Sequence, residues 1–314
     1  MAASIARKVL RLLVFLLGLT FLSFCLLKLV PGDPVRGILR VDEMAATQDQ
    51  MGGIRKELGL DLPLYRQYGI WLSQLLKLDL GSSYLSGRPV AAEFAEKLPN
   101  TLALAAGSLL VMLLVSLPLG ALAARHRNRW PDRMSRYMSA AVSSMPSFWL
   151  GLLLIDLFAV RLQLLPPMGS EGIASLILPS ATLGLSMAAL YVGLIRSSLI
   201  ESGSQEFILS ARARGIHPFR IFVRHQLRHS LVPLLTLLGE SLASLLGGTV
   251  VIETLFNYPG IGKWIVDAVS ARDYPVIMGY VLFAALFILL VNRSTEAACR
   301  LANPELARKE LRHS

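Results

Sequence analysis

Six long apolar runs limit the fold of this chain more than any other feature of its sequence. An α-helix needs a run of about 20 apolar residues to cross the hydrocarbon core of a bilayer. Helices are expected because a backbone surrounded by lipid must satisfy its own hydrogen bonds. The sequence therefore predicts an all-α, multi-pass integral membrane protein with six transmembrane helices. The runs cover approximately residues 9–30, 101–124, 137–163, 176–199, 231–255 and 276–291.

The charged residues support this class and exclude others. Only 17% of the 314 residues are charged, and the mean hydropathy is +0.56, whereas soluble domains carry about 25% charged residues. The net charge of +10 fits basic residues that gather in the cytoplasmic loops of a membrane protein. We expect no nucleic-acid partner, since no soluble binding module is left to carry one.

The distribution of positive charge predicts the sides of the membrane. Arg7, Lys8 and Arg11 lie at the start of the first apolar run, and five arginines crowd residues 125–136. Lys and Arg are enriched on the cytoplasmic side, and short loops count most. Both termini are therefore predicted to be cytoplasmic. The first run should stay uncleaved, because it is longer than the apolar core of a signal peptide, which has about 7–15 residues.

The expected domain organisation follows from these sides. Residues 31–98 carry eight basic and nine acidic residues with recurring Pro and Gly, which predicts a folded extracytoplasmic loop with short helices. The expected segments are 1–30 (N-terminal cytoplasmic end and first transmembrane helix), 31–98 (extracytoplasmic loop region), 99–297 (five-helix core with a cytoplasmic loop at 200–230) and 298–314 (cytoplasmic tail).

The loop between the fourth and fifth runs is strongly basic. Six arginines and three histidines fall between Arg196 and His229, opposed by only two acidic residues. The pattern predicts a short helix over 206–214 that stops at Gly215, and a second helix over 219–229. Helices joined rigidly to two spans can form a socket for a cytoplasmic partner. The same arginines also fit a helix that lies on anionic membrane lipid, and charge alone leaves both interpretations open.

Motifs for catalysis are missing from the sequence. There is no G-x-x-x-x-G-K-[ST] loop for phosphates, so the chain should not hydrolyse ATP itself. There is also no G-x-S-x-G or H-E-x-x-H motif. His225 and His229 share a helix face, but no third metal ligand is evident. We therefore expect a protein that is not an enzyme and has neither a cofactor nor a metal site.

Three carboxylates in the apolar runs are candidates for a transport pathway or for structural roles: Asp156, Glu240 and Glu253. An ionisable residue inside a membrane is by default a functional hypothesis. Asp156 also lies five residues before Arg161, so a structural role near the outer interface is the alternative. Asp156 and Glu240 further motivate a different class of protein, a self-sufficient channel or an ion-coupled carrier.

Sequence blocks spread over nearly the whole chain carry a family resemblance. They are PGDP (31–34), LGLDLPLYRQY (58–68), LDLGSS (78–83), LPNTLALA (98–105), SMPSFWLG (144–151), SARARG (210–215), RHQLRHSLVP (224–233), GGTVVIETLFNYPGIG (247–262) and RDYPVI (272–277). Together they resemble the permease subunits of binding-protein-dependent ATP-binding-cassette (ABC) importers. Within this family the chain resembles the dipeptide, oligopeptide and nickel group, and residues 210–233 look like its cytoplasmic coupling loop.

The resemblance implies a type I permease fold in the bacterial inner membrane. It also implies a second homologous permease subunit, with a heterodimer favoured, two cytoplasmic ATP-binding subunits and an extracytoplasmic substrate-binding protein. The blocks look closest to nickel-type permeases, so nickel or a metal chelate is the expected substrate, with a di- or oligopeptide as the alternative. The implied ATPase-coupling residues are Ser210, Ala211, Arg212, Ala213, Arg214 and Gly215. Where the importer class often has Glu-Ala-Ala, this chain has Leu209, Ser210 and Ala211.

Overall fold

The regular structure of this protein is helical. A computed structural model describes residues 2–29, 35, 48–170 and 172–302. In these residues the helices are accompanied by a single isolated antiparallel bridge, between Ser82 and Pro89. The all-α prediction is therefore confirmed. The PGDP block at 31–34 lies outside the described residues.

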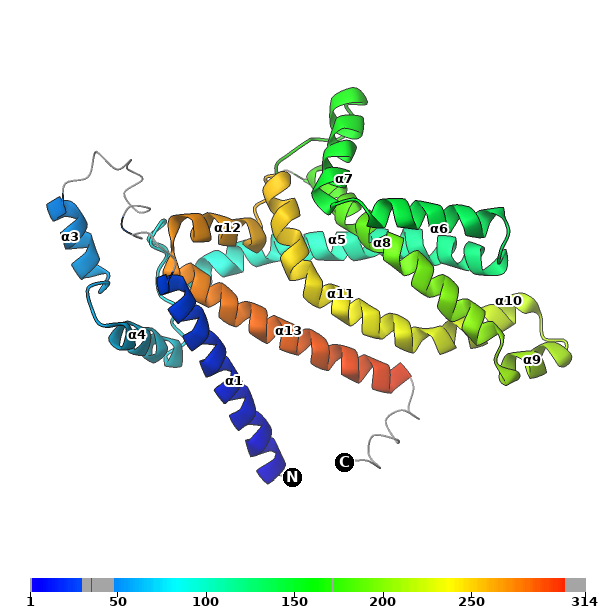
Figure 1. Ribbon diagram of the computed structural model, residues 1–314, viewed down its shortest axis with the longest axis horizontal. Coiled ribbons are helices and arrows are strands. Elements are labelled where there is room, and N and C mark those ends of the chain that lie inside the picture. Colours follow the sequence, from blue (N-terminus) through cyan, green and yellow to red (C-terminus); the bar gives the residue numbers. More distant parts are fainter. Residues whose placement is uncertain (1, 30–34, 36–47, 171, 303–314) are drawn as a thin grey trace. The chain divides into compact units, whose positions relative to one another are not determined.

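The helices are labelled in chain order in Figure 1. The α-helices are α1 (Ala2–Leu29), α3 (Gln48–Glu57), α4 (Leu64–Leu76), α5 (Val90–Arg125), α6 (Trp130–Ser143), α7 (Ser147–Leu154), α8 (Ala174–Gly203), α9 (Glu206–Ala213), α10 (Pro218–Ile221), α11 (Leu227–Leu255), α12 (Ile261–Ala271) and α13 (Tyr274–Ala302). Two π-helical segments, η1 (Ile155–Arg161) and η2 (Phe222–Gln226), follow α7 and precede α11. Of these helices, α1, α5, α8, α11 and α13 are long and apolar enough to cross a membrane.

The third predicted span differs from the continuous helix expected over 137–163. The helix is interrupted between Ser143 and Ser147, and the axis of α7 with η1 is bent by 102° relative to the axis of α6. Pro146 causes the break, because proline has no backbone N–H and its ring disfavours a helical conformation of the residue before it. The predicted number of six spans is reached only when α6 and α7–η1 are counted together as one broken span.

The chain forms two compact units, and the first contains Met1–Pro99 and Gly260–Phe287. In this unit Phe24 of α1, Trp71 of α4 and Met278 of α13 pack in one apolar cluster. The buried carboxylate of Asp273 accepts a hydrogen bond from Ser83 Oγ at 2.6 Å. The described part of 31–98 thus contains the short helices α3 and α4, of which α4 packs through Trp71, while the extracytoplasmic side of this region stays a prediction.

The second unit contains Asn100–Pro259 and the end of α13. Helix α8 packs against α6, α7 and α11, and Figure 1 shows α6 running alongside it. Gly184 brings α8 close to α5, since a Cβ on this glycine would lie 2.6 Å from the Ser108 carbonyl oxygen and from Val111 Cβ. There is therefore no room for larger residues at this helix crossing.

Candidate coupling segment and membrane carboxylates

The α9–α10 segment (residues 204–226) joins α8 to α11. Helix α9 spans Glu206–Ala213, which confirms the predicted helix over 206–214 to within one residue. The predicted stop at Gly215 is also confirmed, because Gly215 has a φ of +70°, in the left-handed region that glycine adopts without steric cost. The second predicted helix begins at Pro218 and continues through η2 into α11.

The α9–α10 segment has a small apolar core of its own. Ile208, Ala211 and Ile221 are all buried, and Ile216 packs against them. The Ile216 backbone N–H donates to the Ala211 carbonyl oxygen at 3.2 Å, which folds the chain back around Gly215. Figure 1 shows α9 and α10 close together where α8 ends and α11 begins. The segment is therefore a folded unit rather than an extended connector.

The structure describes five of the six predicted coupling residues in full, and it buries one of them and exposes four. Ala211 is only 1% exposed, so it packs inside the segment rather than presenting a surface. The side chain of Arg212 lies outside the described residues. The exposed members are Ser210, Ala213, Arg214 and Gly215.

Three exposed apolar side chains of the same segment were missed by the sequence reasoning. They are Phe207, Leu209 and Phe219. Apolar side chains that stay exposed beside polar ones are typical of interaction surfaces. A signal for two of them was present in the sequence, because Phe207 and Leu209 flank Ile208 and so cannot share its buried face of a helix.

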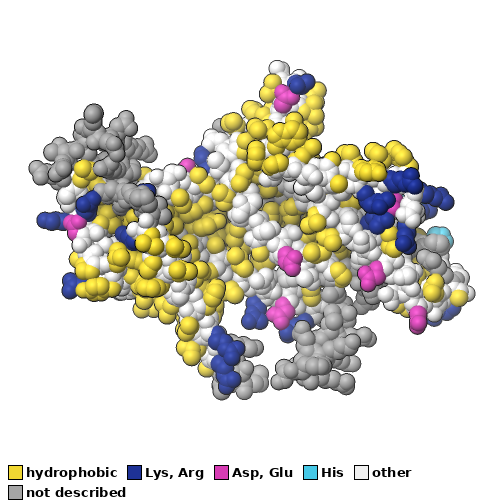
Figure 2. Space-filling model, in the orientation of Figure 1, with side chains coloured by type: hydrophobic (Ala, Val, Ile, Leu, Met, Phe, Trp, Pro, Cys, Tyr) yellow, Lys and Arg dark blue, Asp and Glu magenta, His cyan; other side chains and the backbone are white. Residues whose placement is uncertain are grey.

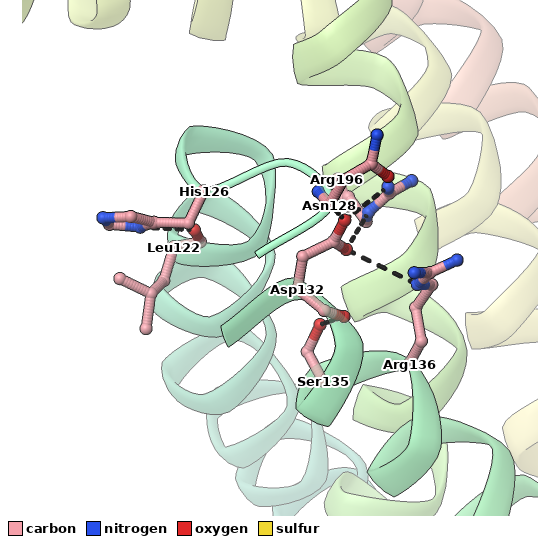
Figure 3. Close-up of polar contacts among 7 residues, drawn as sticks. All are labelled: Leu122, His126, Asn128, Asp132, Ser135, Arg136 and Arg196. Atoms are coloured by element: carbon pink, nitrogen blue, oxygen red, sulfur yellow. Dashed lines mark hydrogen bonds and ion pairs between the residues drawn. The ribbon is translucent and has the colours of Figure 1, made fainter. Parts of the chain in front are cut away.

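A buried ion pair links the basic loop after α5 to α8. Arg196 of α8 donates from Nε and Nη2 to the two carboxylate oxygens of Asp132, with an Nη2–Oδ2 distance of 2.8 Å. The backbone N–H of Asn128 also donates to Asp132 Oδ2, at 2.7 Å. The side chains of Asp132 and Arg196 are 0% and 17% exposed. Figure 3 shows the Arg196 guanidinium facing this carboxylate, and the Arg136 side chain also directed toward it.

This ion pair fixes the turn between α5 and α6. Asn128 has a φ of +62°, and the hydrogen bond from its N–H to Asp132 holds this turn in place. Asp132 is the only acidic residue among five arginines in 125–136, a pattern that could have marked it as a structural anchor. The pair ties this loop to α8 about two turns before α8 ends at Gly203.

The three candidate carboxylates lie in different environments. Asp156 accepts a hydrogen bond from Arg161 Nε at 2.7 Å, and both side chains are exposed. This pairing supports the structural alternative for Asp156, although exposed pairs contribute little to stability. Glu240 is exposed near the middle of α11. Glu253, on the same helix, is fully buried and lies about 20 Å along the axis from Glu240 at 1.5 Å per residue.

The Glu253 carboxylate is enclosed between helices and hydrogen-bonded, and it does not reach the surface of the structure. Thr101 of α5 donates from Oγ1 to Glu253 Oε1 at 2.7 Å, and both residues are buried. One residue earlier, Asn100 Nδ2 donates to the Pro259 carbonyl oxygen at 2.9 Å. The start of α5 within this unit is thereby fixed to the end of α11.

In the described part of the chain, no group of three His, Cys, Asp or Glu residues is placed to hold a metal ion.

Substituting Thr101 with valine should destabilise the second unit moderately. Valine keeps the shape of threonine but removes the donor to the buried Glu253 carboxylate, and such a loss costs about 1–3 kcal/mol. We expect a lower melting temperature in detergent, measured by thermal unfolding. Substituting Thr254 with valine is the matched control, because its hydroxyl donates to the carbonyl of Val250 and its side chain is exposed. Equal melting temperatures for the two variants would contradict this role of Thr101.

The chain matches two family models. The model described as "Binding-protein-dependent transport system inner membrane component" covers residues 116–308, and the one for the N-terminal part of such membrane components covers residues 1–105. Relatives include the glutathione transport system permease protein GsiC of Escherichia coli (strain K12) and of Salmonella paratyphi A. Each is 36% identical over 305 residues, which covers 97% of this chain and 99% of the relative.

A solved structure has a similar fold. It belongs to the inward-facing MetNI methionine ABC transporter, with a TM-score of 0.57 and 18% identity over 67% of this chain and 96% of that chain. At this identity the likeness concerns the fold alone, and it confirms the expected type I permease fold.

Both family models and the relatives point to the same class of protein. Such permeases cross the inner membrane several times, leave ATP hydrolysis to separate ATP-binding subunits, and receive substrate from a binding protein. The chain is thus not itself an enzyme. It belongs to the family of inner-membrane permease components of binding-protein-dependent ABC importers.

Proposed function

We propose that the chain forms part of the translocation pathway of an ATP-driven importer for glutathione or other short peptides. The observation that carries this proposal is the alignment with glutathione transport system permeases, which extends over 97% of this chain at 36% identity. The sequence blocks favoured nickel or a metal chelate, but these relatives support the peptide alternative better. Nickel-type and peptide permeases share much of the GGTVVIETLFNYPGIG block at 247–262, so this block does not separate the two substrates.

The partners and the orientation extend this proposal. A second, homologous permease would complete the pathway as a heterodimer. Both termini and the 200–230 loop would be cytoplasmic, with the 31–98 region outside. The arginines of 125–136 and of the α9–α10 segment support this orientation, since basic residues are enriched in cytoplasmic loops. ATP-binding subunits supply the energy in this family, which argues against an ion-coupled carrier.

The α9–α10 segment is the proposed docking site for an ATP-binding subunit. Its exposed apolar residues are Phe207, Leu209 and Phe219, and a small core of Ile208, Ala211 and Ile221 keeps the segment in one shape. Helix α9 follows α8 after two residues, and α10 continues through η2 into α11. A docked subunit that moves this segment would therefore move α8 and α11 with it. Arg214 and Gly215 lie exposed at the turn and would contribute to the same surface.

Uptake by the reconstituted importer tests the proposed substrate. The permease, its partner permease, the ATP-binding subunits and the binding protein would be placed in proteoliposomes and supplied with glutathione, a dipeptide, Ni²⁺ or chelated Ni²⁺. We expect ATP-dependent accumulation of the peptides. The same vesicles with ATP-binding subunits that cannot hydrolyse ATP serve as the control. Accumulation of nickel without accumulation of either peptide would contradict the proposal.

A further inference from the structure

The exposed residues of α11 lie on one stripe of the helix. Every side chain from Pro233 to Leu255 is described, and the exposed positions follow one another at intervals of three or four residues. This spacing keeps them on a single face of an α-helix. They are Pro233, Thr236, Glu240, Ser244, Gly247, Val251 and Thr254.

This stripe reverses the arrangement expected of a helix in contact with lipid. The eight leucines between 233 and 255 are all buried or half-buried, and the exposed positions are polar or glycine apart from Pro233 and Val251. Helix α1 shows the ordinary arrangement, since Leu13, Phe21 and Leu22 are among its many exposed apolar side chains. A polar face is costly in hydrocarbon. The stripe therefore belongs against water or against protein.

The remaining faces of α11 are held by neighbouring helices. Gly239 lies directly against Thr295 of α13, with no room for a side chain between them. On α8, the Tyr191 hydroxyl is hydrogen-bonded to Ser241 Oγ at 2.7 Å. Helix α11 is thus fixed in rotation by the residues on either side of Glu240. In the view of Figure 2, acidic side chains (magenta) lie singly on the face shown rather than gathered in one patch.

We infer that this stripe of α11 lines the water-filled transport pathway, and that Glu240 attracts the ammonium group of a substrate that carries a free amine. This inference rests on the proposed function and adds the substrate group that the permease itself recognises. Glu240 is the only charged residue on the stripe and lies near its middle. A carboxylate accepts charge-assisted hydrogen bonds from an ammonium group, and a peptide with a free amino terminus supplies one.

Cysteine labelling tests whether the stripe faces water. In a background with Cys25 and Cys299 replaced by serine, Ser244→Cys and Thr254→Cys would be exposed to a charged, membrane-impermeant thiol reagent in the assembled importer. We expect both to react in at least one nucleotide state. Two matched controls should stay unmodified: Leu22→Cys, exposed on the apolar face of α1, and Leu245→Cys, buried beside Ser244. Stripe positions that never react, as in a dry protein interface, would overturn the inference.

Transport kinetics test the role of the carboxylate. For Glu240→Gln we expect the KM for a peptide with a free amino terminus to rise about tenfold, because a hydrogen bond to a charged group is lost. The KM for an N-acetylated peptide should not change in Glu240→Gln. Glu240→Asp keeps the carboxylate, so it should retain most of the difference in KM between the free and the acetylated peptide. An unchanged KM for the free peptide in Glu240→Gln would overturn the assignment of Glu240.

The two proposals fail in distinguishable ways. If the wild-type importer accumulates neither peptide, the proposed function is wrong. The wild type could accumulate peptide while Glu240→Gln has the same KM as the wild type for the free and for the N-acetylated peptide. In that case only the role of Glu240 is wrong. Labelling of Ser244→Cys is independent of the substrate supplied and reports on the stripe in either case.

Discussion

Substituting Asp132 with alanine should abolish ATP-driven uptake and lower the free energy of unfolding by about 3–5 kcal/mol, the usual cost of removing one partner of a buried ion pair. The substitution leaves the Arg196 guanidinium, 17% exposed, without the carboxylate that it faces. It also removes the acceptor for the Asn128 N–H, so the turn between α5 and α6 loses its anchor. Thermal unfolding in detergent and uptake in proteoliposomes would measure the two effects.

The control variants separate stability from coupling. Arg136→Ala should be close to wild type, because its side chain is half exposed and its Nε lies 3.6 Å from Asp132 Oδ1. Asp132→Ala combined with Arg196→Met should regain stability relative to Asp132→Ala, since no buried charge then lacks a partner. If this double variant is stable but still cannot couple ATP hydrolysis to uptake, the ion pair also transmits motion to α8. An Asp132→Ala protein as stable as the wild type would contradict the role of the pair.

The spans were predictable because hydrophobicity and length decide them, but the break in the third span was not predicted. Pro179 and Pro233 lie inside α8 and α11, whereas Pro146 separates α6 from α7. The sequence before Pro146 is Ser-Ser-Met, and serines favour turns because their hydroxyls bond to nearby backbone. The two residues directly before Pro179 and Pro233 are both apolar, whereas Ser144 lies two residues before Pro146. A proline within an apolar run is therefore ambiguous alone, and its neighbours carry the additional information.

The coupling segment was predicted better than its surface. Helix propensity and Gly215 fix α9 and its end locally, so the sequence is sufficient for them. Which face of α9 is buried depends on α10, and this placed Ala211 inside. The Asp132–Arg196 pair joins residues 64 positions apart, which no local pattern can reveal. Likewise, Glu240 and Glu253 are both acids of one apolar run, and only the rotation of α11 among its neighbours exposes the first and buries the second.

The second large effect is expected at Ala211, where arginine should uncouple the permease from its ATP-binding subunits. Ala211 is 1% exposed between Ile208 and Ile221. A long charged side chain has no room there. Overpacking costs about 1–3 kcal/mol of stability, and burying a charge without a partner costs more. The core of the α9–α10 segment should open. The separate apolar cluster around Tyr191 and Ile195 of α8 should remain. The measurements are co-purification of the ATP-binding subunits with the permease, and uptake.

Arg214→Glu is the informative comparison, because it changes the charge of the same segment without touching its core. Arg214 is exposed and follows α9 directly, and its Nε donates to the Ser210 carbonyl oxygen of α9 at 3.3 Å. If the shape of the segment governs docking, Ala211→Arg should lose the ATP-binding subunits entirely and Arg214→Glu should retain them with weakened binding. If charge governs docking, the order reverses. Retention of the subunits and of full uptake by Ala211→Arg would contradict the proposed docking role of the segment, because a surface built on that core cannot survive its disruption.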